Sequence, residues 1–164
     1  MTYSIVYSSK TGNTKLLAET IRNTLPTDDR IYFGPLNDLA LNADRIYVGF
    51  WTNIGSCDAA TAQFLHKAEH KEIFLFGTAG FGASDAYFQQ VATKAAGEVP
   101  ENSTVIGSYM CQGQMPPAIR DKYVGMIGNP KAPFDPIKMI ENFDMAVGHP
   151  NTADLEALVE KIKA

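Results

Sequence analysis

The chain is poor in cysteine, in basic charge and in long apolar runs, and each shortage excludes a class of protein. Two cysteines in 164 residues are too few for the disulfide framework of a small secreted domain. With a formal net charge of −4, the chain lacks the positive electrostatic field that attracts nucleic acid. No apolar run approaches the roughly 20 residues that cross a bilayer, and the N-terminus has no secretory leader pattern. We therefore expect a soluble, cytoplasmic protein with no nucleic-acid or membrane partner.

Metal ligands and catalytic nucleophiles are equally scarce. The His66/His70 pair has no glutamate in the H-E-x-x-H arrangement of a zinc protease, and His149 lies far away in the chain. No histidine follows Cys57 at a distance that suits a catalytic base, and Cys111 ends an apolar segment. The sequence predicts neither a metal site nor a catalytic residue.

Short apolar segments alternate with longer amphipathic ones along most of the chain, which fits one domain over 1–164. The predicted strands are 3–8, 30–33, 44–50, 71–77 and 104–111, and the predicted helices between them are 13–25, 59–68 and 87–97. The run Ile73–Phe76 has no polar face, as a central parallel strand covered on both sides requires. The alternation predicts a doubly wound α/β fold, with five parallel strands and helices on both faces.

Residues 112–150 differ from the rest, because they contain six of the nine prolines and four of the six methionines. Prolines at this density break long helices and favour turns. We expect an irregular excursion that carries short helices at 117–126 and 136–145. A last helix should begin after Asn151 and pack on the sheet through Leu155, Leu158 and Ile162.

The first predicted strand runs directly into the sequence S-S-K-T-G-N-T at 8–14, and a helix follows at once. A helix N-terminus at a strand end offers free backbone N–H groups and partial positive charge, which suit a phosphate. The loop lacks the glycine and lysine spacing of a nucleotide P-loop and the G-x-G-x-x-G of dinucleotide folds. A simple helix-capping run is the alternative interpretation. The predicted phosphate-binding residues are Ser9, Lys10, Thr11, Gly12, Asn13 and Thr14.

Residues 9–14, S-K-T-G-N-T, resemble the [T/S]-x-T-G-x-T phosphate loop of the flavodoxin family, which also follows the first strand. The resemblance covers the whole chain and includes the Trp-Thr pair at 51–52, the Cys-Gln-Gly at 111–113 and the His-Pro-Asn at 149–151. It is greatest with short single-domain flavodoxin-like proteins of anaerobic bacteria. The resemblance implies the sheet order 2-1-3-4-5, a non-covalently bound FMN and one-electron transfer.

Two further loops are expected at the same sheet edge, where they would hold the flavin ring. In the loop after the third strand, Trp51 offers a large stacking surface, although it also suits a core position. In flavodoxins a peptide beside the flavin turns over on reduction, and the resemblance implies that Gly55 serves here; a static turn glycine is the alternative. The predicted ligands in this loop are Trp51, Thr52, Asn53, Ile54 and Gly55.

The loop after the fourth strand is rich in glycine, which lets its backbone approach the pyrimidine end of the ring. Either Phe81 or Tyr87 is expected to cover the second face of the flavin, and Ser84 or Asp85 to cap the next helix. The predicted ligands here are Thr78, Ala79, Gly80, Phe81 and Gly82.

The leading hypothesis is an FMN-containing electron carrier that passes electrons to a partner reductase. Its partners would be redox proteins with basic patches that complement the acidic chain. The rival is an FMN-dependent oxidoreductase that reduces a small molecule, such as a quinone or tetrapyrrole, in a pocket walled by 112–150. A third interpretation is a flavodoxin fold that has lost FMN and only binds a partner.

Overall fold

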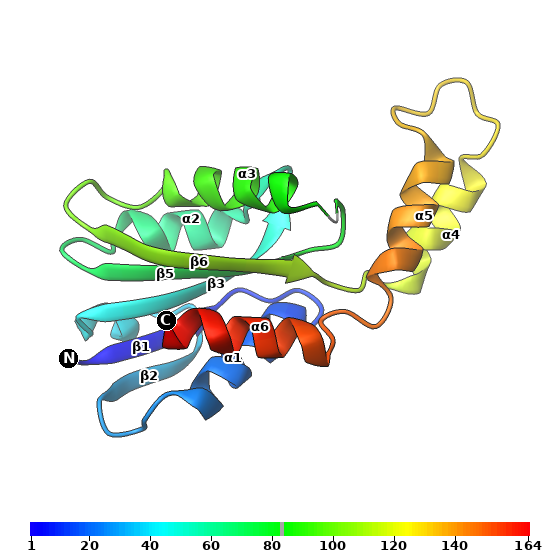
Figure 1. Cartoon of the computed structure of the whole chain (residues 1–164). Coiled ribbons are helices and arrows are strands. Elements are labelled where there is room, and N and C mark those ends of the chain that lie inside the picture. The colour runs from blue at the N-terminus through cyan, green and yellow to red at the C-terminus, as the bar shows by residue number, and fades with distance from the viewer. Residues whose placement is uncertain (83) are drawn as a thin grey trace.

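A parallel sheet of five strands runs through the computed structural model, which describes residues 1–82 and 84–164 (Figure 1). Its spatial order is β2-β1-β3-β5-β6, and every neighbouring pair is parallel. The strands are β1 (Tyr3–Tyr7), β2 (Arg30–Pro35), β3 (Arg45–Asn53), β5 (Glu72–Ala79) and β6 (Thr104–Gln112). The predicted order is confirmed, since the numbers differ only because a short strand, β4, follows β3 in the chain.

The strand β4 (Ser56–Cys57) pairs antiparallel with the end of β3 and closes a hairpin. Its two turn residues, Ile54 and Gly55, have φ of 49° and 74°. Positive φ at both positions gives the turn a twist that matches the paired strands. The sequence prediction ended the third strand at Phe50, so placing Trp51, Thr52 and Asn53 in a loop was wrong: the hairpin pairing extends β3 through them.

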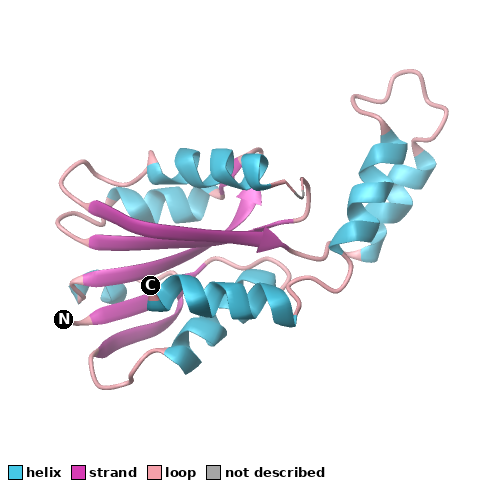
Figure 2. Cartoon of the chain, in the orientation of Figure 1, coloured by secondary structure: helices cyan, strands magenta, loops and turns pink. Residues whose placement is uncertain are grey.

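Helices cover both faces of the sheet, as predicted (Figures 1 and 2). On one face, α1 (Asn13–Thr24) and α6 (Thr152–Lys163) pack through Leu17, Ile21 and Leu158. On the other, α2 (Ala59–His66), α3 (Asp85–Ala96) and the short 3₁₀ helix η1 (Asp38–Asn42) form a second cluster. The helix η1 was not predicted, because its five residues are too few to establish a helical period.

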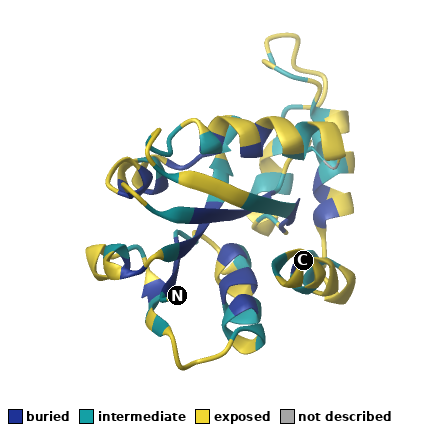
Figure 3. Cartoon of the chain, turned by 60° about the vertical axis from the view of Figure 1, so that its left-hand side comes forward, coloured by how far each residue is buried: buried dark blue, intermediate teal, exposed yellow. Residues whose placement is uncertain are grey.

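The central strands are buried on both sides (Figure 3). Ile73 and Leu75 of β5 belong to one apolar cluster, and Phe74 and Phe76 belong to the other. This is the arrangement expected of an apolar run without a polar face. The two clusters pack the helices onto the two faces of the sheet. The carboxyl ends of the strands are not covered by these helices and continue into loops.

The segment 112–150 is more regular than the sequence suggested. Two antiparallel helices, α4 (Pro117–Gly125) and α5 (Pro136–Ala146), form a hairpin that projects from the edge of the sheet, here called the arm (residues 117–146; Figure 1). Each helix starts with its proline, where the missing N–H costs nothing. The guanidinium Nε of Arg120 lies 2.8 Å from Asp144 Oδ1 and links the two helices. The prolines thus start helices rather than prevent them.

Two predicted helix starts are confirmed. Ser84 Oγ accepts a hydrogen bond from the backbone N–H of Tyr87 and caps α3. Asn151 and Asp154 form a reciprocal capping box at the start of α6. Among the described residues, no helix is long and apolar enough to cross a membrane.

Candidate functional site

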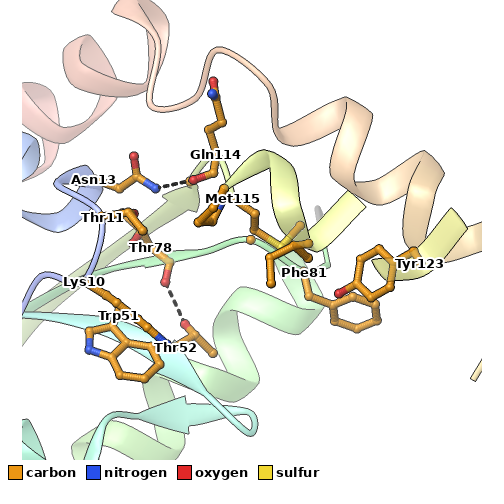
Figure 4. A pocket seen from close by; sticks show the side chains of 14 residues that line it. Lys10, Thr11, Asn13, Trp51, Thr52, Thr78, Phe81, Gln114, Met115 and Tyr123 are labelled. Carbon is orange, nitrogen blue, oxygen red and sulfur yellow. Dashed lines mark hydrogen bonds between the residues drawn. The ribbon is translucent and has the colours of Figure 1, made fainter. Parts of the chain in front are cut away.

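The loops that follow β1, β3, β5 and β6 meet at one edge of the sheet around a hollow of about 390 Å³ (Figure 4). This is the edge where open parallel sheets bind ligands. Its volume lies within the range of roughly 300–1,000 Å³ that suits a single small-molecule ligand. The lining residues are Lys10, Thr11, Asn13, Trp51, Thr52, Thr78, Gly80, Phe81, Gly113, Gln114, Met115, Pro116, Ile119 and Tyr123.

The loop between β1 and α1 is held by one hydroxyl. Ser9 Oγ accepts hydrogen bonds from the backbone N–H of Gly12, at 3.1 Å, and of Lys15, at 3.3 Å. Gly12 has a φ of 94°, a left-handed conformation that glycine adopts without strain. Ser9 and Gly12 therefore shape the loop.

Several backbone N–H groups of this loop remain for a ligand. Those of Thr11, Asn13 and Thr14 donate no hydrogen bond to any residue that the structure describes. They lie at the N-terminal end of α1, where the helix dipole favours an anion. The ammonium group of Lys10, an exposed residue, adds a full positive charge nearby. The loop thus fits a phosphate group.

The hydroxyl of Thr14 serves the fold instead. It is buried, donates to the backbone carbonyl of Phe50 at 3.0 Å and lies 3.1 Å from the hydroxyl of Thr78. These contacts fasten the first turn of α1 to the ends of β3 and β5. The hydroxyl therefore points into the protein, and only the backbone N–H of Thr14 faces a ligand position.

Trp51 stands at the edge of the hollow on the β3–β4 hairpin and is half-buried. The Lys10 ammonium lies 5.0 Å from the centroid of its ring, within cation–π range. The neighbouring Thr52 donates its hydroxyl to the carbonyl of Thr78 at 2.9 Å, which anchors the hairpin to β5 (Figure 4). The indole is thus presented beside the phosphate loop rather than in the core.

In the glycine-rich loop after β5, Gly80 packs closely against the side chain of Met115. A Cβ there would lie 2.5 Å from Cγ of Met115, so only glycine leaves room for that side chain. Phe81 is 47% exposed, and its ring meets that of Tyr87 edge-on at 5.8 Å. Gly80 therefore gives room to the side chain of Met115, a residue that was not predicted to belong to the site.

A second hollow of about 420 Å³ adjoins the first and shares Thr52, Gly80 and Phe81 with it. The rest of its lining comes from Ile54, Gly55, Ala79 and Tyr87, so no charged side chain lines it. A site that extends across both hollows offers a polar end, at the phosphate loop, and an apolar end. FMN has the same division between its phosphate and its ring.

The sixteen predicted ligands divide into three groups. Eight line the first hollow: Lys10, Thr11, Asn13, Trp51, Thr52, Thr78, Gly80 and Phe81. Three line only the second hollow: Ile54, Gly55 and Ala79. Five line neither hollow: Ser9, Gly12, Thr14, Asn53 and Gly82.

Six lining residues were missed by sequence reasoning. Gly113 and Gln114 directly follow β6, and the strand-end rule applied to the other loops predicts them. The remaining four are Met115, Pro116, Ile119 and Tyr123, on or just before α4. No local sequence signal separates them from the rest of the proline- and methionine-rich segment.

The two cysteines are not reactive groups of the site. Both are buried, and burial raises the pKa of the Cys57 thiol. Burial, with a smaller contribution from the nearby Asp154 carboxylate, also raises the pKa of the Cys111 thiol far above its usual range. Both thiols are therefore protonated at neutral pH and are poor nucleophiles.

Comparison with known proteins identifies the family. A family model described as a flavodoxin domain matches residues 4–163. The chain belongs to the flavodoxin family. It is 37% identical to the flavodoxin-like domain-containing protein BilS of Clostridium symbiosum, over 96% of this chain and 92% of that protein. It is 28% identical to BilS of Clostridioides difficile, over 92% of this chain and 88% of the relative.

Solved structures agree on the fold. A flavoprotein of Lactobacillus acidophilus, solved in complex with FMN, superposes with a TM-score of 0.52 at 17% identity. The match covers 67% of this chain and 93% of the other. Family membership, together with the open N–H groups and the two adjoining hollows, supports a flavin cofactor for this chain.

Proposed function

We propose that this flavodoxin-family protein binds FMN and carries electrons between redox proteins. The observation that carries the proposal is the set of N–H groups of Thr11, Asn13 and Thr14, which donate to no described residue. Thr11 and Asn13 line the first hollow together with Lys10. An anion-binding helix N-terminus next to a half-buried indole at the edge of the hollow matches the two ends of one FMN molecule. When bound, FMN supplies reversible transfer of one or two electrons.

The residues of the chain have separate tasks in this proposal. The phosphate loop neutralises the phosphate through backbone N–H groups and Lys10. Trp51 gives the ring a flat apolar surface and excludes water from it. Gly55, which has a positive φ and lines the second hollow, provides a peptide that can reorient at small cost when the charge on the ring changes.

Electrons would pass to and from a partner protein that docks on the solvent-facing side of the second hollow. Ile54, which is 95% exposed, and Phe81 flank the second hollow and are available to a docking protein. A carrier needs only a small, transient interface for this purpose. The partners proposed are a donor reductase and an acceptor oxidoreductase, and the acidic chain favours basic patches on them.

A second candidate is an FMN-dependent oxidoreductase that acts on a small molecule such as a quinone or tetrapyrrole. The observation that favours it is the apolar wall that the arm adds to the first hollow through Ile119 and Tyr123. Such a wall suits a flat apolar substrate as well as it suits a flavin ring.

Reductive titration of the FMN-loaded chain separates the two candidates. A carrier is expected to take up electrons in two resolved one-electron steps, and to oxidise NADH or NADPH only when a separate reductase is present. A single two-electron step, with steady turnover of NAD(P)H and a quinone or tetrapyrrole by the chain alone, would instead establish the enzyme. A chain that retains no flavin after purification and reconstitution would overturn both.

A further inference from the structure

One side chain of the arm bonds twice to the turn that follows β5. Asn142, on α5, donates from Nδ2 to the carbonyl of Gly80 at 2.6 Å. Its Oδ1 accepts a hydrogen bond from the backbone N–H of Gly82 at 2.9 Å. A single part-buried amide group thus bridges two backbone groups that are two residues apart.

Among the residues that the structure describes, the turn at Gly80–Gly82 has no hydrogen-bond partner from a neighbouring strand, so the amide of Asn142 provides one. The pairing of β5 with β6 ends at Ala79 and Gln112, so Gly80 and Gly82 lie beyond the last strand partners. Gly82 has a φ of 74°, and glycines in a turn lose much conformational entropy when they become ordered. Asn142 takes the place of the missing strand neighbour, donating and accepting as a backbone would.

The same turn borders the proposed flavin site. Gly80 and Phe81 line both hollows, and the side chain of Met115, which lies two residues before the arm, packs against Gly80. A shift of the turn would therefore move lining groups of the two hollows together. Because Asn142 joins the turn to α5, a displacement of the arm reaches the same groups.

We propose that Asn142 is a positioning residue that fixes the Gly80–Gly82 turn and couples the arm to the flavin site. The inference rests on the proposed function for its flavin half. Coupling of this kind is reciprocal: a partner that binds the arm changes the affinity for FMN, and FMN changes the affinity for that partner by the same factor. The arm would then respond to occupancy of the flavin site as well as forming one of its walls.

Three variants test the proposal. Asn142→Ala removes both hydrogen bonds, whereas Asn142→Asp keeps the acceptor for the Gly82 N–H and loses the donor to Gly80. Asn129→Ala is the matched control, because Asn129 lies in the loop between α4 and α5, where its side chain accepts only from the backbone N–H of Lys131. Two readouts are measured: amide hydrogen exchange in the ligand-free chain and the Kd for FMN from flavin fluorescence.

In Asn142→Ala, exchange at the Gly82 amide should accelerate about ten-fold and the Kd for FMN should rise about ten-fold, in proportion to the hydrogen bonds lost. In Asn142→Asp, the Gly82 amide should remain as slow as in the wild type while FMN binds more weakly. The control should leave both unchanged. This position-specific pattern distinguishes a positioning role from a general loss of stability.

Unchanged Gly82 exchange in Asn142→Ala would overturn the proposal, as would unchanged affinity for FMN. If Asn142→Ala fails to fold, Asn142→Asp alone decides, through weaker FMN binding with a protected Gly82 amide. A wild-type chain that does not bind FMN contradicts the proposed function and the flavin half of the coupling. The exchange data on the ligand-free chain would still show whether Asn142 fixes the turn.

Discussion

At the scale of single residues, two threonines of one motif have different tasks. The hydroxyl of Thr14 is buried against Phe50 and Thr78, whereas Thr11 is exposed on the phosphate loop. Thr14→Val should lower the free energy of unfolding of the ligand-free chain by about 1–3 kcal/mol, because it leaves buried polar groups without a partner. Thr11→Val should leave that free energy within about 0.5 kcal/mol of the wild type.

Urea unfolding of the two variants, monitored by circular dichroism, measures this difference. Equal losses for both would contradict the separation of tasks. The motif itself does not reveal it, because the two threonines look alike in the sequence and only the helix geometry turns one hydroxyl inward.

The cysteines provide a prediction about pH. Burial raises the pKa of both Cys57 and Cys111 above the ordinary thiol pKa of about 8.5, and that of Cys111 far above it, so their thiolates form less readily in the folded chain. At pH 8.5, iodoacetamide should label the urea-unfolded chain much faster than the native chain. Because the folded chain holds these protons more tightly than the unfolded chain does, the free energy of unfolding is highest below about pH 8.5 and falls as the pH rises above it. Rapid native labelling at either thiol would contradict its burial.

At the scale of elements, the β3–β4 hairpin carries a strained turn. Ile54 is a β-branched residue with φ of 49°, and its side chain is 95% exposed. Asparagine is the favoured residue before glycine in such a turn, so Ile54→Asn should stabilise the ligand-free chain by about 0.5–1 kcal/mol. Gly55→Ala should destabilise it by about 1 kcal/mol or more, because alanine resists a φ of 74°.

Thermal unfolding of the two hairpin variants measures both effects. A loss of stability in Ile54→Asn would mean that the isoleucine contributes packing that outweighs its strain. A rise in stability would show that the exposed isoleucine does not stabilise the fold, which leaves its side chain available for the proposed docking role.

The arm shows what local patterns predict and what they leave open. Its helices lie within a residue or so of the predicted 117–126 and 136–145, because proline and spacing are local signals. The pairing of the two helices depends on contacts such as that of Arg120 with Asp144, 24 positions apart, and Asn142 reaches Gly80 from 62 positions away. Such contacts have no signature in a single sequence.

At the scale of the whole molecule, the fold was predictable because its main signal is repeated along the chain. Five apolar strands alternating with amphipathic helices leave few right-handed arrangements. The order among them was implied by the resemblance to flavodoxins, and the structure has it as β2-β1-β3-β5-β6. The site was predictable only in part. Strand ends locate Thr11, Trp51 and Gly80, whereas Ile119 and Tyr123 come from a helix whose docking against the hollow no local rule gives.

The most direct test of the central claim is a titration of FMN and, separately, of riboflavin into the ligand-free chain. The emission of Trp51, the one tryptophan of the chain, reports the indole end of the site. Saturable quenching at one FMN per chain is expected. Riboflavin, which lacks the phosphate for the N–H groups of the Ser9–Thr14 loop, should bind at least about 100-fold more weakly. Unchanged tryptophan emission, or equal affinity for the two flavins, would contradict the claim.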